Sequence, residues 1–183
     1  MKTPTLTTPR LVLRPLAASD APAIQRGIEH PEVAGQLSTA VPFPYPADGA
    51  VSWIRDHGLP AVERGESHIW VLVPHGQDDA IGVLQYRVEG DDNRGFWLAR
   101  SHWGQGLMTE AVEAFQDWLF LEVGVDAIQV CNAVVNAGSR RVKEKTGAVK
   151  VGEKSLPHNS GGDRTEVWRV TREGWAAYRG VSL

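Results

Sequence analysis

The sequence WGQGLMTEA, residues 103–111, decides the fold of this chain. Gly104 and Gly106 stand between a segment of strand character and an amphipathic helix. Glycine leaves the main chain uncovered, and the first turn of a helix offers unpaired N–H donors at the positive end of its dipole. We therefore expect this loop to bind an anionic group. A tight turn that needs glycine only for its backbone conformation is the alternative.

The segments on either side give the order strand, glycine loop, helix. Residues 95–100 (GFWLAR) read as a short aromatic strand, and apolar residues recur at helical spacing over residues 111–119. A P-loop would need a Lys-Ser/Thr pair where Leu107 and Met108 stand, so this loop is not a P-loop. A dinucleotide fingerprint would need a small residue where Thr109 stands, and it is disfavoured for that reason.

Composition bounds the class of protein. The 183 residues are 42% hydrophobic and 22% charged, which suits a single domain spanning residues 1–183. The net charge of -3, with no basic run, argues against a nucleic-acid partner. No apolar stretch approaches the roughly 20 residues of a membrane span and no signal core precedes the domain, so we expect a cytoplasmic protein without a membrane partner. Cys131 is the single cysteine, and we expect it to be an inert buried thiol.

The remaining pattern predicts a meander followed by alternating strands and helices. We expect strands at residues 11–14, 68–73, 81–88, 95–100, 127–134, 149–153 and 165–170. We expect helices after a cap at Ser19 or Asp20 and after a cap at Asp48, then following the glycine loop, at residues 136–146, and after a cap at Thr171. The meander predicts antiparallel pairing and the alternation predicts a locally parallel pair, so we expect a mixed sheet.

Four segments in order carry a resemblance to a known family: TPRLVLRPLAASDA near the amino terminus, GFWL, HWGQGLMTEA, and NAGSRRVKEKTGAVKVGE. With these motifs the chain resembles the GNAT superfamily of N-acetyltransferases, and within it the RimJ/RimL branch, which acetylates protein amino termini among other amines. The resemblance implies an α+β fold. Its central sheet is mixed, mostly antiparallel and twisted, with about seven strands, a splayed central pair and flanking helices.

The same resemblance implies a site for acetyl-coenzyme A (acetyl-CoA), used as a co-substrate, and implies no metal. It assigns the diphosphate to Trp103, Gly104, Gln105, Gly106, Leu107, Met108 and Thr109, and the pantetheine and thioester to Phe96, Trp97 and Leu98. A main-chain N–H near Leu98 can stabilise the oxyanion that forms on attack. Core packing is the alternative for the aromatic residues Phe96, Trp97 and Trp103, and it is favoured for Trp97. Arg141 is the candidate for the adenosine 3′-phosphate, with a solvated helix face as the alternative.

The expected reaction is direct attack of an uncharged primary amine on the thioester in a ternary complex. Many GNAT enzymes carry a tyrosine acid where this chain has Lys143, so the usual acid is missing. Asn136 and Ser139 match the N-x-x-S helix start of the RimL-like branch, and we nominate Ser139 as the acid or hydrogen-bond donor. The alternative is that both residues only cap their helix.

For the base, the resemblance points to the loop at residues 154–164, where His158 has a suitable ordinary pKa near 6.5. An exposed loop histidine is the alternative. Arg94 takes the place of an acidic residue that the branch often carries before this strand. Glu29 and Trp53 are candidates for contact with the acceptor, a protein amino terminus or a small-molecule amine.

Two alternative functions stay open, and so does the oligomeric state. The chain can be a CoA-binding sensor or interaction module without turnover, or it can use another acyl-CoA such as succinyl-CoA. A homodimer is also allowed. The residues leave the identity of the amine undecided.

Overall fold

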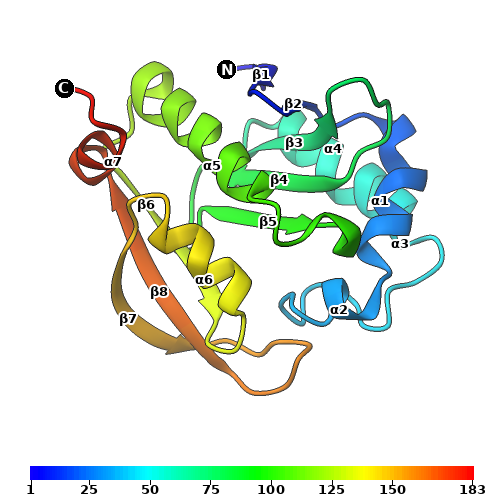
Figure 1. Cartoon of the computed structure of the whole chain (residues 1–183). Helices are drawn as coiled ribbons and strands as arrows, with labels where there is room; N and C mark the ends of the chain where they lie inside the picture. The colour runs from blue at the N-terminus through cyan, green and yellow to red at the C-terminus, as the bar shows by residue number, and fades with distance from the viewer.

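The strands of the protein form two antiparallel sheets that meet at one splayed pair (Figure 1). The computed structural model describes all residues, 1–183. The larger sheet has the order β1 (Leu6–Thr7), β2 (Leu11–Pro15), β3 (Ser67–Pro74), β4 (Gly82–Arg87), β5 (Arg94–Leu98). The smaller sheet has the order β6 (Ala127–Ala133), β8 (Arg164–Thr171), β7 (Val149–Ser155). The expected α+β fold with antiparallel strands is confirmed, and the two-residue β1 is an addition that its length hid from the pattern.

Strands β5 and β6 form no ladder, in keeping with the splayed pair that the resemblance implies, and the locally parallel pairing predicted from the alternation is found in neither sheet. Side chains from the turn before β5 take the main-chain donors of β6 instead. Asn93 Oδ1 accepts from Gln129 N at 2.9 Å, and Asp92 Oδ1 accepts from Cys131 N at 3.0 Å. A main-chain bond from Asn93 N to Gln129 O, at 2.7 Å, joins the two strands where they begin. Beyond that bond the strands separate, and this separation positions the site.

The helices are α1 (Ala21–Ile28), α2 (Pro31–Ala34), α3 (Gly49–Trp53), α4 (Leu59–Glu63), α5 (Leu107–Trp118), α6 (Ala137–Glu144) and α7 (Arg172–Arg179). A π-helical turn, Ile54–Gly58, joins α3 to α4 just before Pro60. Thr171 caps α7 as expected, accepting from Gly174 N.

The cap expected at the start of α1 is wrong in its chemistry. Asp20 precedes the helix, but its side chain caps no helical amide. Both of its carboxylate oxygens accept from Arg14, at 2.6 and 2.9 Å, and one also accepts from Ala17 N. A charged partner on β2 therefore outcompetes the local amides for this carboxylate.

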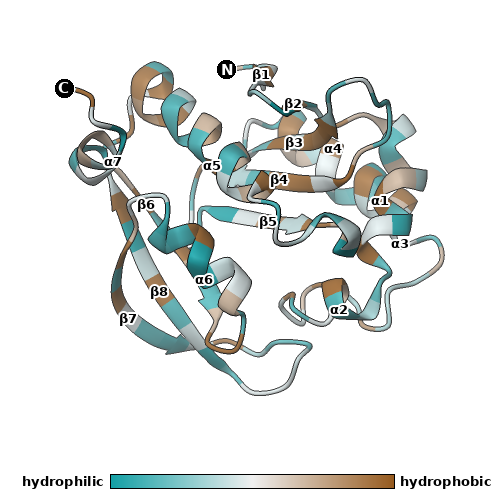
Figure 2. Cartoon of the chain, in the orientation of Figure 1, coloured by the Kyte–Doolittle hydropathy of each residue, from teal (hydrophilic) through white to brown (hydrophobic).

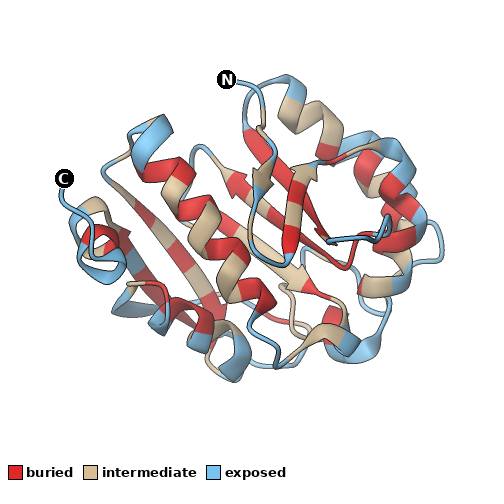
Figure 3. Ribbon diagram, turned by 45° about the horizontal axis from the view of Figure 1, so that its top comes forward, coloured by how far each residue is buried: buried red, intermediate tan, exposed pale blue.

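The larger sheet is covered on both faces, which explains why its central strand reads as a continuous apolar run (Figure 2). Trp70 of β3 packs toward α5, where its ring lies 5.2 Å from that of Trp118. Alternate residues Ile69 and Val71 pack with Ile24 of α1 on the opposite face. Buried and half-buried residues alternate along helix α5, so one face packs against the sheet and the other is only partly covered (Figure 3). None of the helices combines the length and apolarity needed to span a bilayer.

Candidate active site

The glycine loop, residues 103–109, presents an unbroken row of unpaired main-chain donors. Gly104 and Gly106 have φ values of +76° and +77°, a conformation that favours glycine. No main-chain N–H from residue 104 to residue 109 donates to an acceptor within the chain, whereas Glu110 N donates to Gly106 O. Because the last of these amides open α5, they also lie at the positive end of its dipole.

The loop is held in this shape by Thr8 and Arg10, which lie in the turn between β1 and β2. Arg10 donates to Gln105 O at 2.8 Å and to Glu110 Oε2 at 2.6 Å. Thr8 Oγ1 donates to the other oxygen of the same carboxylate at 2.6 Å. The amides therefore point outward before any ligand arrives, so less ordering is required on binding.

The space over the loop fits a bulky anion. A Cβ atom added at Gly104 would meet no other atom within 4 Å, and one added at Gly106 would lie 3.6 Å from Arg10 Nη2. Unpaired amides, open space and a nearby cation are the features of a diphosphate site. Arg141 on α6 is exposed and forms no ion pair, whereas its neighbour Arg140 is paired with Glu166 at 2.9 Å.

Strand β5 turns one row of main-chain groups toward the gap that separates it from β6. Ala99 N donates to Ile81 O, on the β4 side. Since orientation alternates along an antiparallel strand, the main-chain groups of Phe96 and Leu98 face the gap. Trp103 Nε1 donates to Leu98 O at 2.7 Å, which ties the glycine loop to the end of this strand. The gap thus offers amide partners to a ligand chain that leaves the loop.

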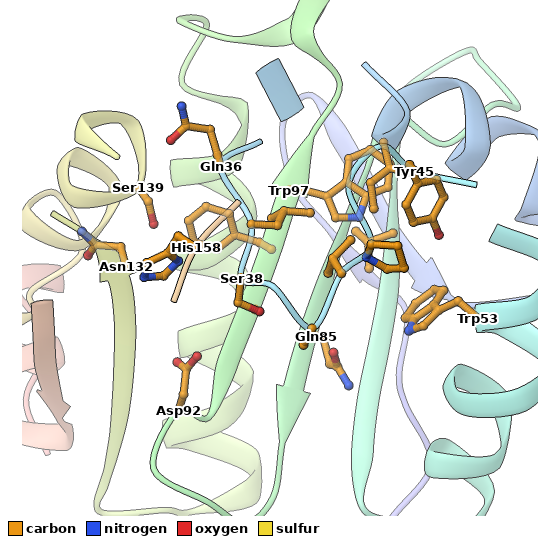
Figure 4. Close-up of a pocket in the computed structure, with 18 of the residues that line it drawn as sticks. Gln36, Ser38, Tyr45, Trp53, Gln85, Asp92, Trp97, Asn132, Ser139 and His158 are labelled. Atoms are coloured by element: carbon orange, nitrogen blue, oxygen red, sulfur yellow. The ribbon is translucent and has the colours of Figure 1, made fainter. Parts of the chain in front are cut away.

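A cavity of about 780 Å³ extends from the gap toward α3, within the range of small-molecule sites. Ser139 and His158 line one side of it, and Tyr45 and Trp53 line the other (Figure 4). Trp97 lies between the two groups. The structure therefore brings together residues from β5, α6, α3 and the β7–β8 loop.

Asn136 caps α6 with its side chain, whereas the side chain of Ser139 takes no part in the cap. Asn136 Oδ1 accepts from Ser139 N at 2.9 Å, so the asparagine caps α6. The Ser139 hydroxyl is not used in the cap. It lines the cavity and accepts from Lys143 Nζ at 2.9 Å.

Two buried cations stand behind this serine, and sequence reasoning gave neither of them a role. Lys143 and Arg94 are 1% and 3% exposed. Burial and the nearby Arg94 lower the pKa of Lys143 to about 7, and burial lowers the pKa of Arg94 to about 10. The Arg94 nitrogens have no hydrogen-bond partner, and both cations lie 5.6 Å from the centre of the Phe96 ring.

Asp92 is a cavity residue that the sequence analysis missed. Arg94 stands where the branch often carries an acidic residue, and Asp92 lies two residues earlier, in the turn that precedes β5. Burial raises the pKa of Asp92, although the nearby Arg87 opposes the shift. One oxygen accepts from Cys131 N and the other from Arg87 Nη2 at 3.3 Å, so both oxygens are engaged. The adjacent acids Asp91 and Asp92 were the available signal.

His158 lies in the cavity, not on the surface of its loop. It is 9% exposed, and its Nε2 is 2.7 Å from Thr165 Oγ1. Its Nδ1 has no hydrogen-bond partner. Burial lowers the pKa of His158, so the ring is neutral near pH 7. Asn159 fixes the loop by donating to the main-chain oxygens of Ala34 and Val41, at 3.1 and 2.8 Å.

The two residues predicted to contact the acceptor, Trp53 and Glu29, lie in different places. Trp53 lines the cavity, but Glu29 is exposed and lies outside it. Ile24 and Ile28 of α1 face the cavity, and Glu29 follows the helix on its solvent side, where it accepts from Gln25 Nε2. The contact of Glu29 with the acceptor stays a prediction. Trp97 contacts α1 closely at Gly27, where an added Cβ would lie 2.7 Å from the indole, in keeping with the packing role favoured for it.

Cys131 lines the cavity but is poorly suited to act as a nucleophile. Burial, with Asp92 nearby, raises the pKa of its thiol to about 11. No group of three or more His, Cys, Asp or Glu side chains is placed to hold a metal ion.

Known proteins share both the sequence pattern and the architecture. The Acetyltransferase (GNAT) domain profile matches residues 10–149. The uncharacterized N-acetyltransferase p20 of Bacillus licheniformis is 28% identical over 131 residues, covering 68% of this chain and 71% of that protein. The structure of ribosomal-protein-S5-alanine acetyltransferase from Vibrio fischeri superimposes with a TM-score of 0.78 at 19% identity, covering 94% of this chain and 98% of that one. RimJ of Mycobacterium smegmatis, solved with CoA-disulfide, gives 0.78 at 18% identity and 98% coverage of both chains. The solved structures show a shared fold, and the profile covers most of the sequence, so the chain belongs to the GNAT family of acetyltransferases.

Proposed function

We propose that this chain, acting as one domain, transfers an acetyl group from acetyl-CoA to a primary amine, either a protein amino terminus or a small-molecule amine. The observation that supports this proposal most strongly is the row of unpaired main-chain amides over residues 104–109, beside the gap between β5 and β6. Amides held by the fold grip phosphate oxygens without ordering side chains. That the related M. smegmatis structure was solved with a CoA derivative supports the same ligand here.

The gap supports the placement of the donor. A pantetheine arm leaving the loop would run along β5, where the main-chain groups of Phe96 and Leu98 face it. One of these N–H groups would then stabilise the oxyanion that forms on the thioester carbonyl. This function needs a fixed backbone and no particular side chain.

The two proton transfers have separate candidates. Ser139 donates to the departing sulfur, because its hydroxyl lines the cavity and is not used in the helix cap. His158 takes the proton of the acceptor ammonium, directly or through water, because its Nδ1 is unpartnered. Asp92 is the weaker base, since both of its oxygens are already engaged.

A thiol-release assay tests this function. The protein is mixed with acetyl-CoA and a panel of peptides with free amino termini, polyamines and small amines, and free thiol is followed with a chromogenic reagent. We expect acceptor-dependent release. Thermal stabilisation by CoA with no release for any acceptor would instead identify a binding module. Release from succinyl-CoA in preference to acetyl-CoA would overturn the acetyl assignment alone.

A further inference from the structure

We propose that Lys143 and Ser139 form a two-step proton relay, in which Ser139 protonates the leaving sulfur and Lys143 reprotonates Ser139. The inference rests on the proposed function, because the relay serves acyl transfer. It adds a positioning and proton-supplying role for a residue that touches no substrate.

The hydrogen bond between the two side chains gives the relay its direction. Lys143 Nζ lies 2.9 Å from Ser139 Oγ, one helical turn away on α6. An ammonium group can only donate, so Ser139 Oγ is the acceptor in this bond. The serine keeps its own hydrogen, and the cavity lies beside it. The cap that would otherwise occupy the hydroxyl is supplied by Asn136.

The surroundings of Lys143 lower the pKa of its ammonium group, so that this group releases a proton readily. Burial and the positive charge of Arg94 on β5 disfavour the ammonium form of Lys143 and lower its pKa. Asp92 before β5, Cys131 on β6 and Glu166 on β8 favour the ammonium form, but their effect is smaller than that of burial. Glu166 is not free to neutralise it, because that carboxylate accepts from Arg140, Asn132 and Lys150. The side chain has no carboxylate in contact, and its one hydrogen bond is to the serine.

The step balances in atoms and charge. As the C–S bond breaks, its electron pair goes to sulfur and the Ser139 hydroxyl hydrogen is transferred to it. The Lys143 ammonium then transfers a proton to Ser139 Oγ, which leaves a free thiol, an intact serine and a neutral lysine amine. The proton released by the attacking amine restores the ammonium through solvent. No oxidant, metal or further reactant is required.

The test compares Lys143→Arg with Lys143→Met. Arginine keeps the positive charge and the hydrogen-bond donors but does not lose its proton in this pH range. A purely structural lysine would be replaced by arginine with little loss, whereas a proton-supplying lysine would not. We measure kcat for thiol release between pH 6 and 9 at saturating substrates, and the KM for acetyl-CoA. Lys2→Arg, at an exposed lysine near the amino terminus, is the matched control.

We expect both Lys143 variants to lose about tenfold or more in kcat with the KM changed less than about twofold. The wild-type kcat should fall on the alkaline side as Lys143 loses its proton, and this limb should be absent in Lys143→Arg. A wild-type rate and pH profile in Lys143→Arg would overturn the relay while leaving the acetyltransferase intact. No thiol release from the wild-type protein would instead overturn the proposed function and the relay with it.

A second measurement does not depend on folding of the variants. In wild-type protein labelled with 13C at lysine Cε, one lysine signal should titrate near neutral pH and the rest near their ordinary range. If every lysine signal titrates above pH 9, Lys143 is an ordinary ammonium that does not release its proton near neutral pH, and the relay as proposed is wrong.

Discussion

The two ends of the site are built in different ways. The glycine loop is exposed and works through main-chain amides, and its shape follows from two glycines with positive φ. The closed end comprises the half-buried Asp92 and the buried Arg94 and Lys143, and it presents charged side chains from two separate segments. We therefore expect binding at the loop to tolerate changes of side chain and chemistry at the closed end to depend on each charge.

The largest effect expected is at the loop. Gly104→Val strains a backbone with φ of +76° and places a branched side chain in the space over the amides, so CoA affinity should fall by about 100-fold or more. Gly65→Val is the matched control, since Gly65 has φ of +73° and open space in the turn between α4 and β3, and it does not line the cavity. Calorimetry with CoA measures both. Equal affinity in wild type and Gly104→Val would refute the loop assignment.

Ser139→Ala removes the hydroxyl that accepts from Lys143 at the closed end, and it strains the backbone less than Gly104→Val does. We expect kcat to fall about 10- to 100-fold with nearly unchanged CoA affinity, because the hydroxyl acts on the sulfur and not in the cap. Thr171→Ala removes the cap of α7 and should cost about 1 kcal/mol of stability without changing kcat. If Ser139→Ala lowers only the melting temperature and keeps normal specific activity, its role is structural.

His158→Ala should act mainly at low pH. Burial lowers the pKa of His158, so the wild-type base is lost only as the pH falls below its ordinary value near 6.5. Without the imidazole, an α-amine of pKa near 8 must deprotonate unaided, so the rate should be about tenfold low at pH 6 and recover toward pH 9. Rate profiles with a peptide acceptor measure this. Superimposable profiles for wild type and variant would remove His158 as the base.

The last effect expected is a pH-dependent difference in stability. The pKa of Lys143 is about 7 when folded and about 10.4 when unfolded, so between these values the unfolded chain binds more protons. The free energy of unfolding of wild type should therefore rise relative to Lys143→Met as pH increases from 7 to 9, by up to about 1.4 kcal/mol per pH unit. Urea unfolding at each pH measures the difference. Parallel curves for the two proteins would show that the lysine is not buried as an ammonium.

The same contrast explains how much the sequence could predict. The glycine loop and the cap at Thr171 depend on neighbouring residues, and a local pattern predicts them. The unpaired state of β5 and β6 depends on Asp92 and Asn93 side chains that replace a ladder, which no periodicity reveals.

The closed end was hidden for a related reason. Lys143 follows Ser139 by one helical turn, so their contact was readable from spacing. That Arg94 would lie beside them, without a partner, depends on packing between β5 and α6. Glu29 shows the converse, since a plausible charge in the right region points to solvent because the other face of α1 is buried.

The central claim is that main-chain amides of residues 104–109 hold the diphosphate of an acyl-CoA donor. Titration calorimetry of the wild-type protein with acetyl-CoA, and in parallel with S-acetylpantetheine, which lacks the diphosphate, tests it most directly. The account predicts saturable binding of acetyl-CoA and at least about 100-fold weaker binding of the truncated thioester. No heat with acetyl-CoA, or equal affinity for the two thioesters, would contradict it.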